Sequence, residues 1–261
     1  MKNHALMRKL FVFQSLMRKN AKLELTFDGR THNRFQSNNQ DVLTAGVIFW
    51  SIDTVLFDLD GTLADSVELI LAAYRHTMQR CLGHVPADEL WLAGLGTPLA
   101  TQLHEFASDA EQHELMRVTF RDFSNEHHDE MLGSYDGISE LLSELQKRQI
   151  KLALVTSKHR ASSLRAFRVL GLMGIFEVLV CADTVERHKP DPMPVRQALE
   201  QLGSEPGRAI FVGDSPHDMV SVRRAGVRTA VACWGPFSKA HLAPTAPDYW
   251  LQDPSDLLAL L

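Results

Sequence analysis

Two aspartates that follow a short apolar run give the strongest chemical signal in the sequence. The run Val55–Phe57 leads directly into Asp58, and Asp60 and Gly61 come just after it. Apolar residues bounded by Asp and Gly predict a short buried strand. Side chains alternate across a strand, so Leu59 would face away and both carboxylates would start out on the same side. Paired carboxylates repel each other, which points to a hard cation between them or to a nucleophile that works beside an acid.

Three further apolar runs also end in polar residues. Thr156 and Ser157 follow the run Lys151–Val155, and Lys189 follows the run Val178–Cys181. Asp214 and Asp218 follow the run Ala209–Val212. Ligands bind beyond the carboxyl ends of the strands in open parallel α/β sheets. Together the four segments supply carboxylates, a hydroxyl and an ammonium. This set suits magnesium-assisted phosphoryl transfer, which depends on positioning and charge neutralisation.

Strand patterns and helix patterns alternate along most of the chain. Besides the apolar runs, the sequence predicts helices over 137–149, 160–170, 193–202 and 219–225, and strands over 176–181 and 229–232. This alternation predicts an α/β fold: a doubly wound parallel sheet with helices on both faces. Residues 66–132 instead show helical spacing throughout and no strand signal. They predict a small all-helical cap inserted after the first strand, with the α/β core formed by residues 51–65 and 133–261.

Composition and charge are those of an ordinary soluble globular protein. The chain has 261 residues, a net charge of −5, 45% hydrophobic residues and three cysteines. We therefore expect no nucleic-acid partner, no disulfide framework and no zinc site. The few scattered cysteines fit a reducing cytosol, so we expect a cytoplasmic protein. No apolar run reaches the ~18 residues that span a bilayer, so we expect no membrane partner.

Residues 1–50 differ from the rest of the chain. They carry eight Lys or Arg against three acidic residues, and residues 31–40 are almost wholly polar. The apolar stretch Leu10–Phe13 is too short for a secretory signal. We expect a flexible N-terminal extension without a catalytic role. A basic arm that touches nucleic acid or membrane is the alternative.

The four polar segments, in this order, resemble the four motifs of the haloacid dehalogenase superfamily in its phosphatase branch. Asp58 to Thr62 matches the first motif, Thr156 or Ser157 the second, and Lys189 the third. Gly213 and Asp214 through Asp218 match the fourth. The resemblance covers residue 52 to the C-terminus and implies the α/β core with the small helical cap. It also implies Mg²⁺ as cofactor and a small phosphorylated substrate.

The resemblance implies a role for each motif residue. Asp58 would be the nucleophile that forms an aspartyl-phosphate, and Asp60 the general acid and base. Mg²⁺ would be held by Asp58, by the backbone carbonyl of Asp60 and by Asp214.

The remaining motif residues would bind the phosphoryl group or support the metal. Lys189 and Thr156 would hold the phosphoryl group, with the Ser157 amide nearby. The Ser157 side chain could instead cap a helix. Asp218 could bind the metal through water, orient Lys189 or cap a helix.

Within this family, the sequence resembles the phosphoglycolate phosphatases and the related pyrophosphatases. We expect a phosphoglycolate phosphatase-like enzyme, with inorganic pyrophosphatase or sugar phosphomutase as alternatives. A non-catalytic regulatory protein with the same fold is the alternative outside enzymes. Asp60 excludes a dehalogenase, because the resembling dehalogenases lack that carboxylate. The oligomeric state is expected to be monomer or homodimer.

Two other stretches could contribute to a site. Gly94–Pro98 is a candidate cap loop that faces the active site, because small residues allow close approach, although it could equally be an ordinary turn between helices. His127–Asp129 could suggest a metal site, but we expect a solvated helix face there.

Overall fold

The computed structural model describes residues 43–44, 47–48 and 51–261, so most of the predicted extension lies outside the described residues. Within that extension, β1 (Leu43–Thr44) and β2 (Val47–Ile48) pair antiparallel. No strand was expected there from the sequence, because two-residue strands are too short to leave a periodic pattern.

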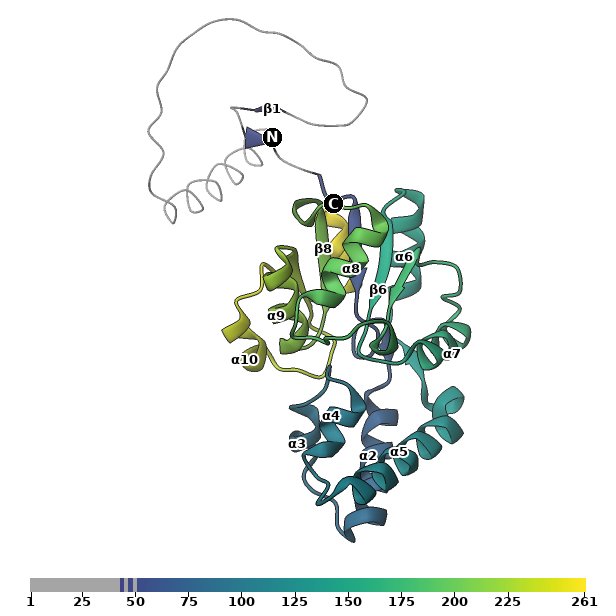
Figure 1. Ribbon diagram of the computed structural model, residues 1–261. Helices are drawn as coiled ribbons and strands as arrows, with labels where there is room; N and C mark the ends of the chain where they lie inside the picture. The colour runs from purple at the N-terminus through teal and green to yellow at the C-terminus, as the bar shows by residue number, and fades with distance from the viewer. Residues whose placement is uncertain (1–42, 45–46, 49–50) are drawn as a thin grey trace, which may run out of the picture. The chain divides into compact units, whose positions relative to one another are not determined.

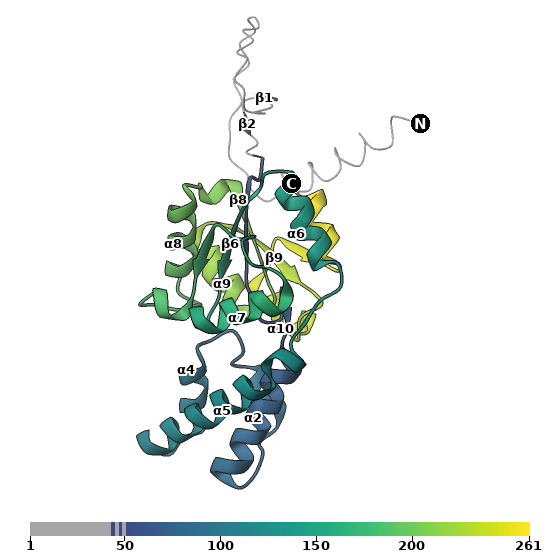
Figure 2. The same ribbon diagram turned by 90° about the vertical axis from the view of Figure 1, so that its right-hand side faces the viewer.

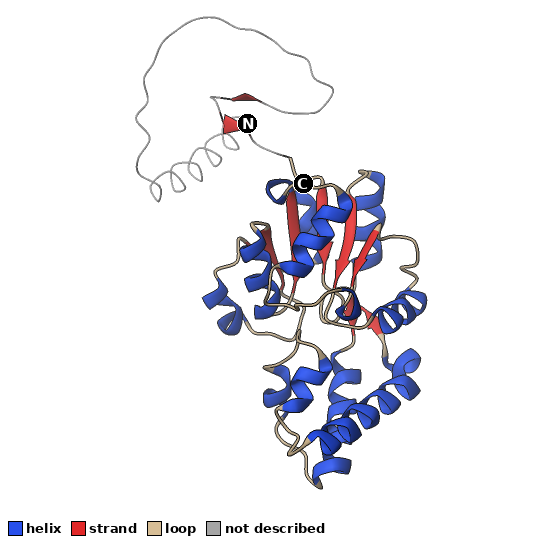
Figure 3. Ribbon diagram, in the orientation of Figure 1, coloured by secondary structure: helices blue, strands red, loops and turns tan. Residues whose placement is uncertain are grey.

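A six-stranded parallel sheet forms the centre of the fold (Figure 3). In spatial order its strands are β10 (Tyr249–Leu251), β9 (Arg228–Ala232), β8 (Ala209–Gly213), β3 (Thr54–Phe57), β6 (Lys151–Val155) and β7 (Val178–Val180). Phe57 of β3 is in register with Leu154 of β6 and Val212 of β8. The three central strands therefore end at the same level, and the residues after them meet at one edge.

Helices cover both faces of this sheet, as Figure 2 shows for α6 and α8. The helices of the core are α6 (Ile138–Lys147), α7 (Arg160–Leu170), α8 (Met193–Leu202), α9 (Pro216–Ala225) and α10 (Lys239–Leu242). Val55 and Phe57 pack in the cluster that contains α6 and α7, whereas Leu56 packs with α8 and α9. This two-sided burial explains why β3 reads as a continuous apolar run. The predicted doubly wound α/β fold is confirmed.

Most predicted elements lie within two residues of their observed bounds, while the shortest ones were missed. The described residues also form four 3₁₀ helices, η1 (Ala182–Thr184), η2 (Pro206–Arg208), η3 (Ala243–Thr245) and η4 (Pro254–Ala259). Neither these helices nor the edge strand β10 was predicted. The helix predicted over 219–225 begins earlier, at Pro216, because Pro is favourable in the first turn of a helix.

Residues 66–132, which we call the cap, contain the helices that follow β3 (Figure 1). They are α2 (Val67–Leu82), α3 (Asp88–Leu92), α4 (Leu99–His104) and α5 (Ala110–Met131). The cap has its own buried cluster, which includes Tyr74, Trp91 and Met116. Two short strands, β4 (Ala64–Asp65) and β5 (Gly133–Ser134), pair where the chain enters and leaves the cap. In the part of the chain that the structure describes, no helix is both long enough and apolar enough to span a membrane.

Candidate active site

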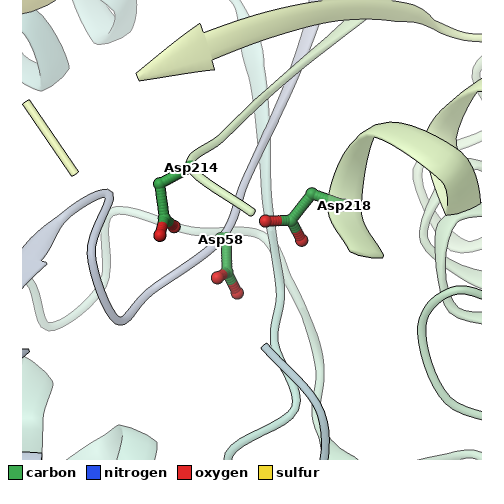
Figure 4. A group of neighbouring side chains, drawn as sticks. All are labelled: Asp58, Asp214 and Asp218. Atoms are coloured by element: carbon green, nitrogen blue, oxygen red, sulfur yellow. The ribbon is translucent and has the colours of Figure 1, made fainter. Parts of the chain in front are cut away.

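Three buried carboxylates converge at the carboxyl edge of the sheet (Figure 4). Asp58 follows β3, Asp214 follows β8, and Asp218 lies in the first turn of α9. One oxygen atom of each lies within 4.8 Å of the others. Asp58 is 4% exposed, and the other two are more deeply buried. Residues 160 positions apart in the sequence thus form one acidic cluster.

Lys189 is the cation that faces this cluster. Its Nζ lies 2.8 Å from Asp58 Oδ1 and 2.6 Å from Asp218 Oδ1, and it also donates to the carbonyl of Val155 at 3.2 Å. Burial acts to lower the pKa of Lys189, but the charges of Asp218 and Asp58 outweigh it and raise that pKa. The side chain is therefore a fixed ammonium, which compensates one of the three negative charges.

The remaining negative charge is costly for the cluster. Burial raises the pKa of Asp58 to about 7, and Lys189 only partly offsets the effect. Burial, followed by the charges of Asp218 and Asp58, raises the pKa of Asp214 well above its ordinary value. Asp214 Oδ2 is buried and has no hydrogen-bond partner among the described residues. An unpartnered carboxylate oxygen in an acidic, all-oxygen cluster fits a hard divalent cation such as Mg²⁺.

The first motif also positions Asp214. Thr62 Oγ1 donates to Asp214 Oδ1 at 2.9 Å. Gly61 has φ +80°, and a Cβ atom built there would lie 2.5 Å from Asp214 Oδ2. A side chain at position 61 would therefore clash with the carboxylate as well as strain the backbone.

Asp218 takes part in two kinds of contact. Its Oδ2 accepts from the backbone amide and the hydroxyl of Ser215, at 3.1 and 2.6 Å, and its own amide donates to Ser215 Oγ. Ser215 is therefore the N-cap of α9, and Asp218 is the third residue of a capping box. Asp218 is therefore not the N-cap residue itself, but its side chain takes part in the cap, and its contact with Lys189 leaves the orienting role a prediction.

The Asp60 side chain lies apart from the cluster. Lys158 Nζ contacts both carboxylate oxygens of Asp60, at 2.8 and 3.0 Å, and Ser66 Oγ donates to Oδ1 at 2.7 Å. Burial acts to raise the pKa of Asp60, but Lys158 and Ser66 together outweigh it and lower that pKa. Metal ligation by Asp60 was expected through its backbone carbonyl, and that expectation stays a prediction.

Sequence reasoning missed Lys158 and Ser66 as partners of Asp60. The signal for Lys158 was its position two residues after Thr156, in the loop that follows β6. The signal for Ser66 was a hydroxyl residue directly before a helix. Neither position by itself identifies the carboxylate that is contacted, because that depends on how distant segments meet.

Thr156 and Ser157 line the site, but Ser157 caps no helix. Helix α7 begins at Arg160 with His159 as its N-cap. Ser157 Oγ instead donates to the carbonyl of Gly96 in the cap, at 2.6 Å. The capping alternative for Ser157 is therefore wrong, because a tertiary contact takes its hydroxyl. Thr156 Oγ1 accepts from the Lys158 amide at 3.2 Å, which leaves its hydroxyl hydrogen available to a ligand.

A cavity of about 120 Å³ lies between the sheet edge and the cap. Its core wall includes Asp58, Asp60, Lys158 and Asp214. The residues that line it from the cap are Ile70, Trp91, Leu95, Gly96, Thr97, Leu99, Gln102 and Phe120. The Gly94–Pro98 loop thus faces the site through three of its members, Leu95, Gly96 and Thr97. The Gly96 φ is +94°, and a Cβ atom there would lie 2.7 Å from Ser215 Oγ, so close approach of cap and core requires glycine.

His128 departs from the expected solvated helix face. It is buried on α5, and its Nδ1 lies 2.7 Å from Asp129 Oδ1. Asp129 in turn accepts from Arg165 Nε of α7 at 2.9 Å. His127 and Asp129 are more accessible than His128. The structure brings no metal-ligating group to these residues within the part of the chain that it describes.

Comparison with known families gives a match over most of the chain. The family model described as "Haloacid dehalogenase-like hydrolase" matches residues 55–232. This range contains all of the motif residues discussed above.

Curated relatives align over nearly their full length. Pyrophosphatase PpaX of Bacillus velezensis is 38% identical over 208 residues, which cover 79% of this chain and 95% of the relative. Pyrophosphatase PpaX of Bacillus pumilus is 38% identical over 211 residues, covering 81% and 97%.

Solved structures show the same fold. A protein from Lactobacillus plantarum, provisionally named a phosphoglycolate phosphatase, has a TM-score of 0.72 and 26% identity, covering 81% of this chain and all of that one. A predicted phosphatase from Clostridium acetobutylicum has a TM-score of 0.70 and 26% identity, covering 79% of this chain and 96% of that one.

Proposed function

The chain belongs to the haloacid dehalogenase-like hydrolase family, and we propose that it is a Mg²⁺-dependent phosphatase with Asp58 as its nucleophile. The observation that carries this proposal is the charge of the buried cluster. Three carboxylates face one ammonium, and one carboxylate oxygen of Asp214 is unpartnered. A buried excess of negative charge is costly unless a cation offsets it.

Mg²⁺ fits this cluster and would be held by Asp58, Asp214 and the Asp60 carbonyl, with Asp218 contacting it through water. When bound, it would neutralise the carboxylates and polarise the phosphoryl group, so that an anionic nucleophile can approach an anionic substrate.

Asp58 is oriented for attack by its contact with Lys189. In the first step a carboxylate oxygen of Asp58 bonds to phosphorus, and the bond from phosphorus to the leaving oxygen breaks. Lys189 and the Thr156 hydroxyl stabilise the charge on the phosphoryl oxygens. In the second step water attacks phosphorus and the bond to Asp58 breaks, which releases phosphate and regenerates the carboxylate.

Asp60 would give a proton to the leaving oxygen and later take one from the attacking water. Its ion pair with Lys158 opposes the first of these roles, because the pair stabilises the ionised carboxylate. An anionic leaving group that draws Lys158 away from Asp60 would remove this stabilisation of the ionised carboxylate. We therefore propose that Lys158 leaves Asp60 and pairs with the substrate when the substrate binds.

Inorganic pyrophosphate is the substrate that we propose first. The names of the curated relatives support it, and so does the position of the cation. Lys158 is the only cation among the described residues that line the cavity. In pyrophosphate the second phosphorus is bonded directly to the leaving oxygen, so its charge stays beside Asp60 and Lys158. The carboxylate of 2-phosphoglycolate lies one bond further from that oxygen.

Phosphoglycolate phosphatase activity, the expectation from sequence, remains the second candidate. The Lactobacillus plantarum structure supports it at 26% identity. Both candidates share the same chemistry at phosphorus and differ in the group that faces the cap.

Phosphate release tests the proposal directly. Wild-type protein is assayed with pyrophosphate, 2-phosphoglycolate and sugar phosphates, with Mg²⁺ and with EDTA. We expect release that needs Mg²⁺, that is fastest with pyrophosphate, and that Asp58→Asn abolishes. Asp122→Asn, which makes the same chemical change at an exposed position of α5, should keep full activity. Release that survives EDTA or Asp58→Asn would contradict the mechanism.

A further inference from the structure

The cap wall of the cavity contains two buried polar groups that the proposed chemistry does not use. Trp91 is 1% exposed, and its Nε1 has no hydrogen-bond partner among the described residues. Gln102 is 9% exposed, and its Oε1 is likewise unpartnered there. Both residues line the cavity. Buried polar atoms normally have partners, so two unpaired ones beside the reaction centre indicate a ligand.

The Trp91 ring is held rigidly. It stacks on Tyr74 and Phe120, with ring centroids 4.8 and 5.4 Å apart. These contacts fix the direction of the indole N–H, which can only donate. The cap therefore presents one hydrogen-bond donor in a fixed position.

The Gln102 amide also has a defined orientation. Its Nε2 donates to the carbonyl of Thr97 at 2.9 Å. Rotating the amide by half a turn would place Oε1 against that carbonyl, and two acceptors would then face each other. The unpartnered atom is therefore the acceptor Oε1, and the cap wall combines one donor with one acceptor.

We propose that Trp91 and Gln102 form a leaving-group subsite that selects a group able both to accept and to donate a hydrogen bond, and that disfavours a carboxylate. The inference rests on the proposed function, because it assigns the part of the substrate that faces the cap. An ionised carboxylate satisfies Trp91 but places a second acceptor against Gln102 Oε1. A hydroxyl, or the P–OH of a departing hydrogenphosphate, satisfies both residues.

The absence of a cation among the described residues of the cap wall also disfavours a carboxylate there. Among the cavity-lining residues that the structure describes, the cap contributes no cation that could compensate a carboxylate. Arg75 and Arg117 of the cap pair with acidic residues of the cap itself. A carboxylate that reaches the cap wall would therefore lose its hydration without gaining a cation from the cap, whereas the charge of a leaving phosphate stays beside Lys158 of the core wall.

A matched pair of substrates tests this subsite. 2-Phosphoglycolate and 2-hydroxyethyl phosphate differ only in a terminal carboxylate or CH₂OH group, and pyrophosphate serves as the third substrate. We expect kcat/KM for 2-hydroxyethyl phosphate to exceed that for 2-phosphoglycolate by about tenfold or more. Calorimetric binding of both compounds to the Asp58→Asn variant in the presence of Mg²⁺ gives the same comparison without turnover.

Substitutions in the subsite should change this preference. Gln102→Met keeps the length of the side chain and removes the acceptor, so the ratio should fall to about threefold or less. Gln102→Lys adds a cation and should raise kcat/KM for 2-phosphoglycolate. Trp91→Phe should weaken all three substrates, because each accepts a hydrogen bond. Gln79→Met, the same change at an exposed position of α2, is the control.

The outcomes separate this inference from the proposed function. A wild-type preference for 2-phosphoglycolate, or a ratio that Gln102→Met leaves unchanged, overturns the subsite while the phosphatase chemistry stands. Release that persists in Asp58→Asn instead overturns the proposed function. A reduced ratio in Gln102→Met together with an unchanged ratio in Gln79→Met supports the subsite.

Discussion

The core and cap walls of the cavity differ in the way that their polar groups are satisfied. On the core wall, Asp58 and Asp60 each contact a lysine, at 2.8 Å in both cases. On the cap wall, Trp91 and Gln102 are neutral and keep one unpartnered polar atom each. Charge therefore gathers where the phosphoryl group is expected, whereas neutral hydrogen-bonding groups face the part that leaves. This contrast teaches that chemistry and selectivity can reside on separate walls of one cavity.

Among variants that keep the nucleophile, the largest expected effect comes from removing the acid on the core wall. Asp60→Asn keeps the shape of the side chain but cannot deliver a proton, so kcat should fall by roughly 10²- to 10⁴-fold for pyrophosphate. The loss in the first step should be much smaller for p-nitrophenyl phosphate, whose leaving group departs without protonation. The burst of p-nitrophenol and rapid-quench formation of the aspartyl-phosphate from pyrophosphate measure this step apart from the later hydrolysis, in which Asp60 acts as the base. An equal loss in the first step for both substrates would exclude Asp60 as the acid.

The next effect concerns the buried ammonium. Lys189→Met leaves Asp58 and Asp218 without their cation, so the free energy of unfolding in EDTA should fall by about 3–5 kcal/mol. Urea denaturation followed by circular dichroism measures the change. Lys147→Met removes an exposed lysine of α6 and should leave stability nearly unchanged. If both variants lost the same stability, the buried ion pairs would not be the cause.

A smaller effect concerns the pH dependence of folding stability, which the raised pKa values of the carboxylate cluster should change. Because burial raises the pKa of Asp58 to about 7, the folded metal-free protein keeps a proton that the unfolded chain has lost between about pH 4 and pH 7. Stability from this group is present at low pH and is lost as the pH rises towards 7. The raised pKa of Asp214 acts in the same direction. Mg²⁺ binds the ionised carboxylates and should offset the loss.

We therefore expect Mg²⁺ to stabilise the protein more near pH 8 than near pH 5, by roughly 1–3 kcal/mol. Thermal denaturation with and without Mg²⁺ at each pH measures this difference. Taking the difference also removes contributions from buried histidines that do not contact the metal. Asp214→Asn should flatten the dependence, and an equal effect of Mg²⁺ at both pH values would contradict the assignment of the cluster.

The smallest effect tests the contact between the two walls. Ser157→Ala removes the hydrogen bond to the carbonyl of Gly96, which is worth about 1 kcal/mol. KM for pyrophosphate should rise severalfold while kcat changes little, because the hydroxyl holds the cap loop and is not assigned to the chemistry. A loss confined to kcat would show that Ser157 acts on the reacting group.

The sequence predicted the core wall better than the cap wall, for a physical reason. Asp58, Lys189 and Asp214 each follow a strand of the parallel sheet, and that topology brings the ends of such strands together. The strand patterns alone therefore placed these residues at one edge. The pairing of Lys158 with Asp60 depends on side-chain direction, which local patterns do not specify.

In and around the cap, local rules competed with tertiary contacts. Ser157 precedes a helix and was therefore a candidate helix N-cap. Its hydroxyl instead donates to the carbonyl of Gly96 in the cap region. His128 was expected on a solvated face and is buried, because one side of α5 faces inward. Trp91 and Gln102 gave no functional signal in the sequence, since an apolar helix face and a lone amide are common in any helical region.

Direct detection of an aspartyl-phosphate tests the central claim. The enzyme is mixed with pyrophosphate and Mg²⁺, quenched in acid within milliseconds and reduced with borohydride, which converts a phosphorylated aspartate to homoserine. Peptide mass spectrometry then locates the modified residue. The mechanism predicts homoserine at position 58 and none in Asp58→Asn. Rapid phosphate release without modification at position 58 would contradict it, because water would then attack the substrate directly.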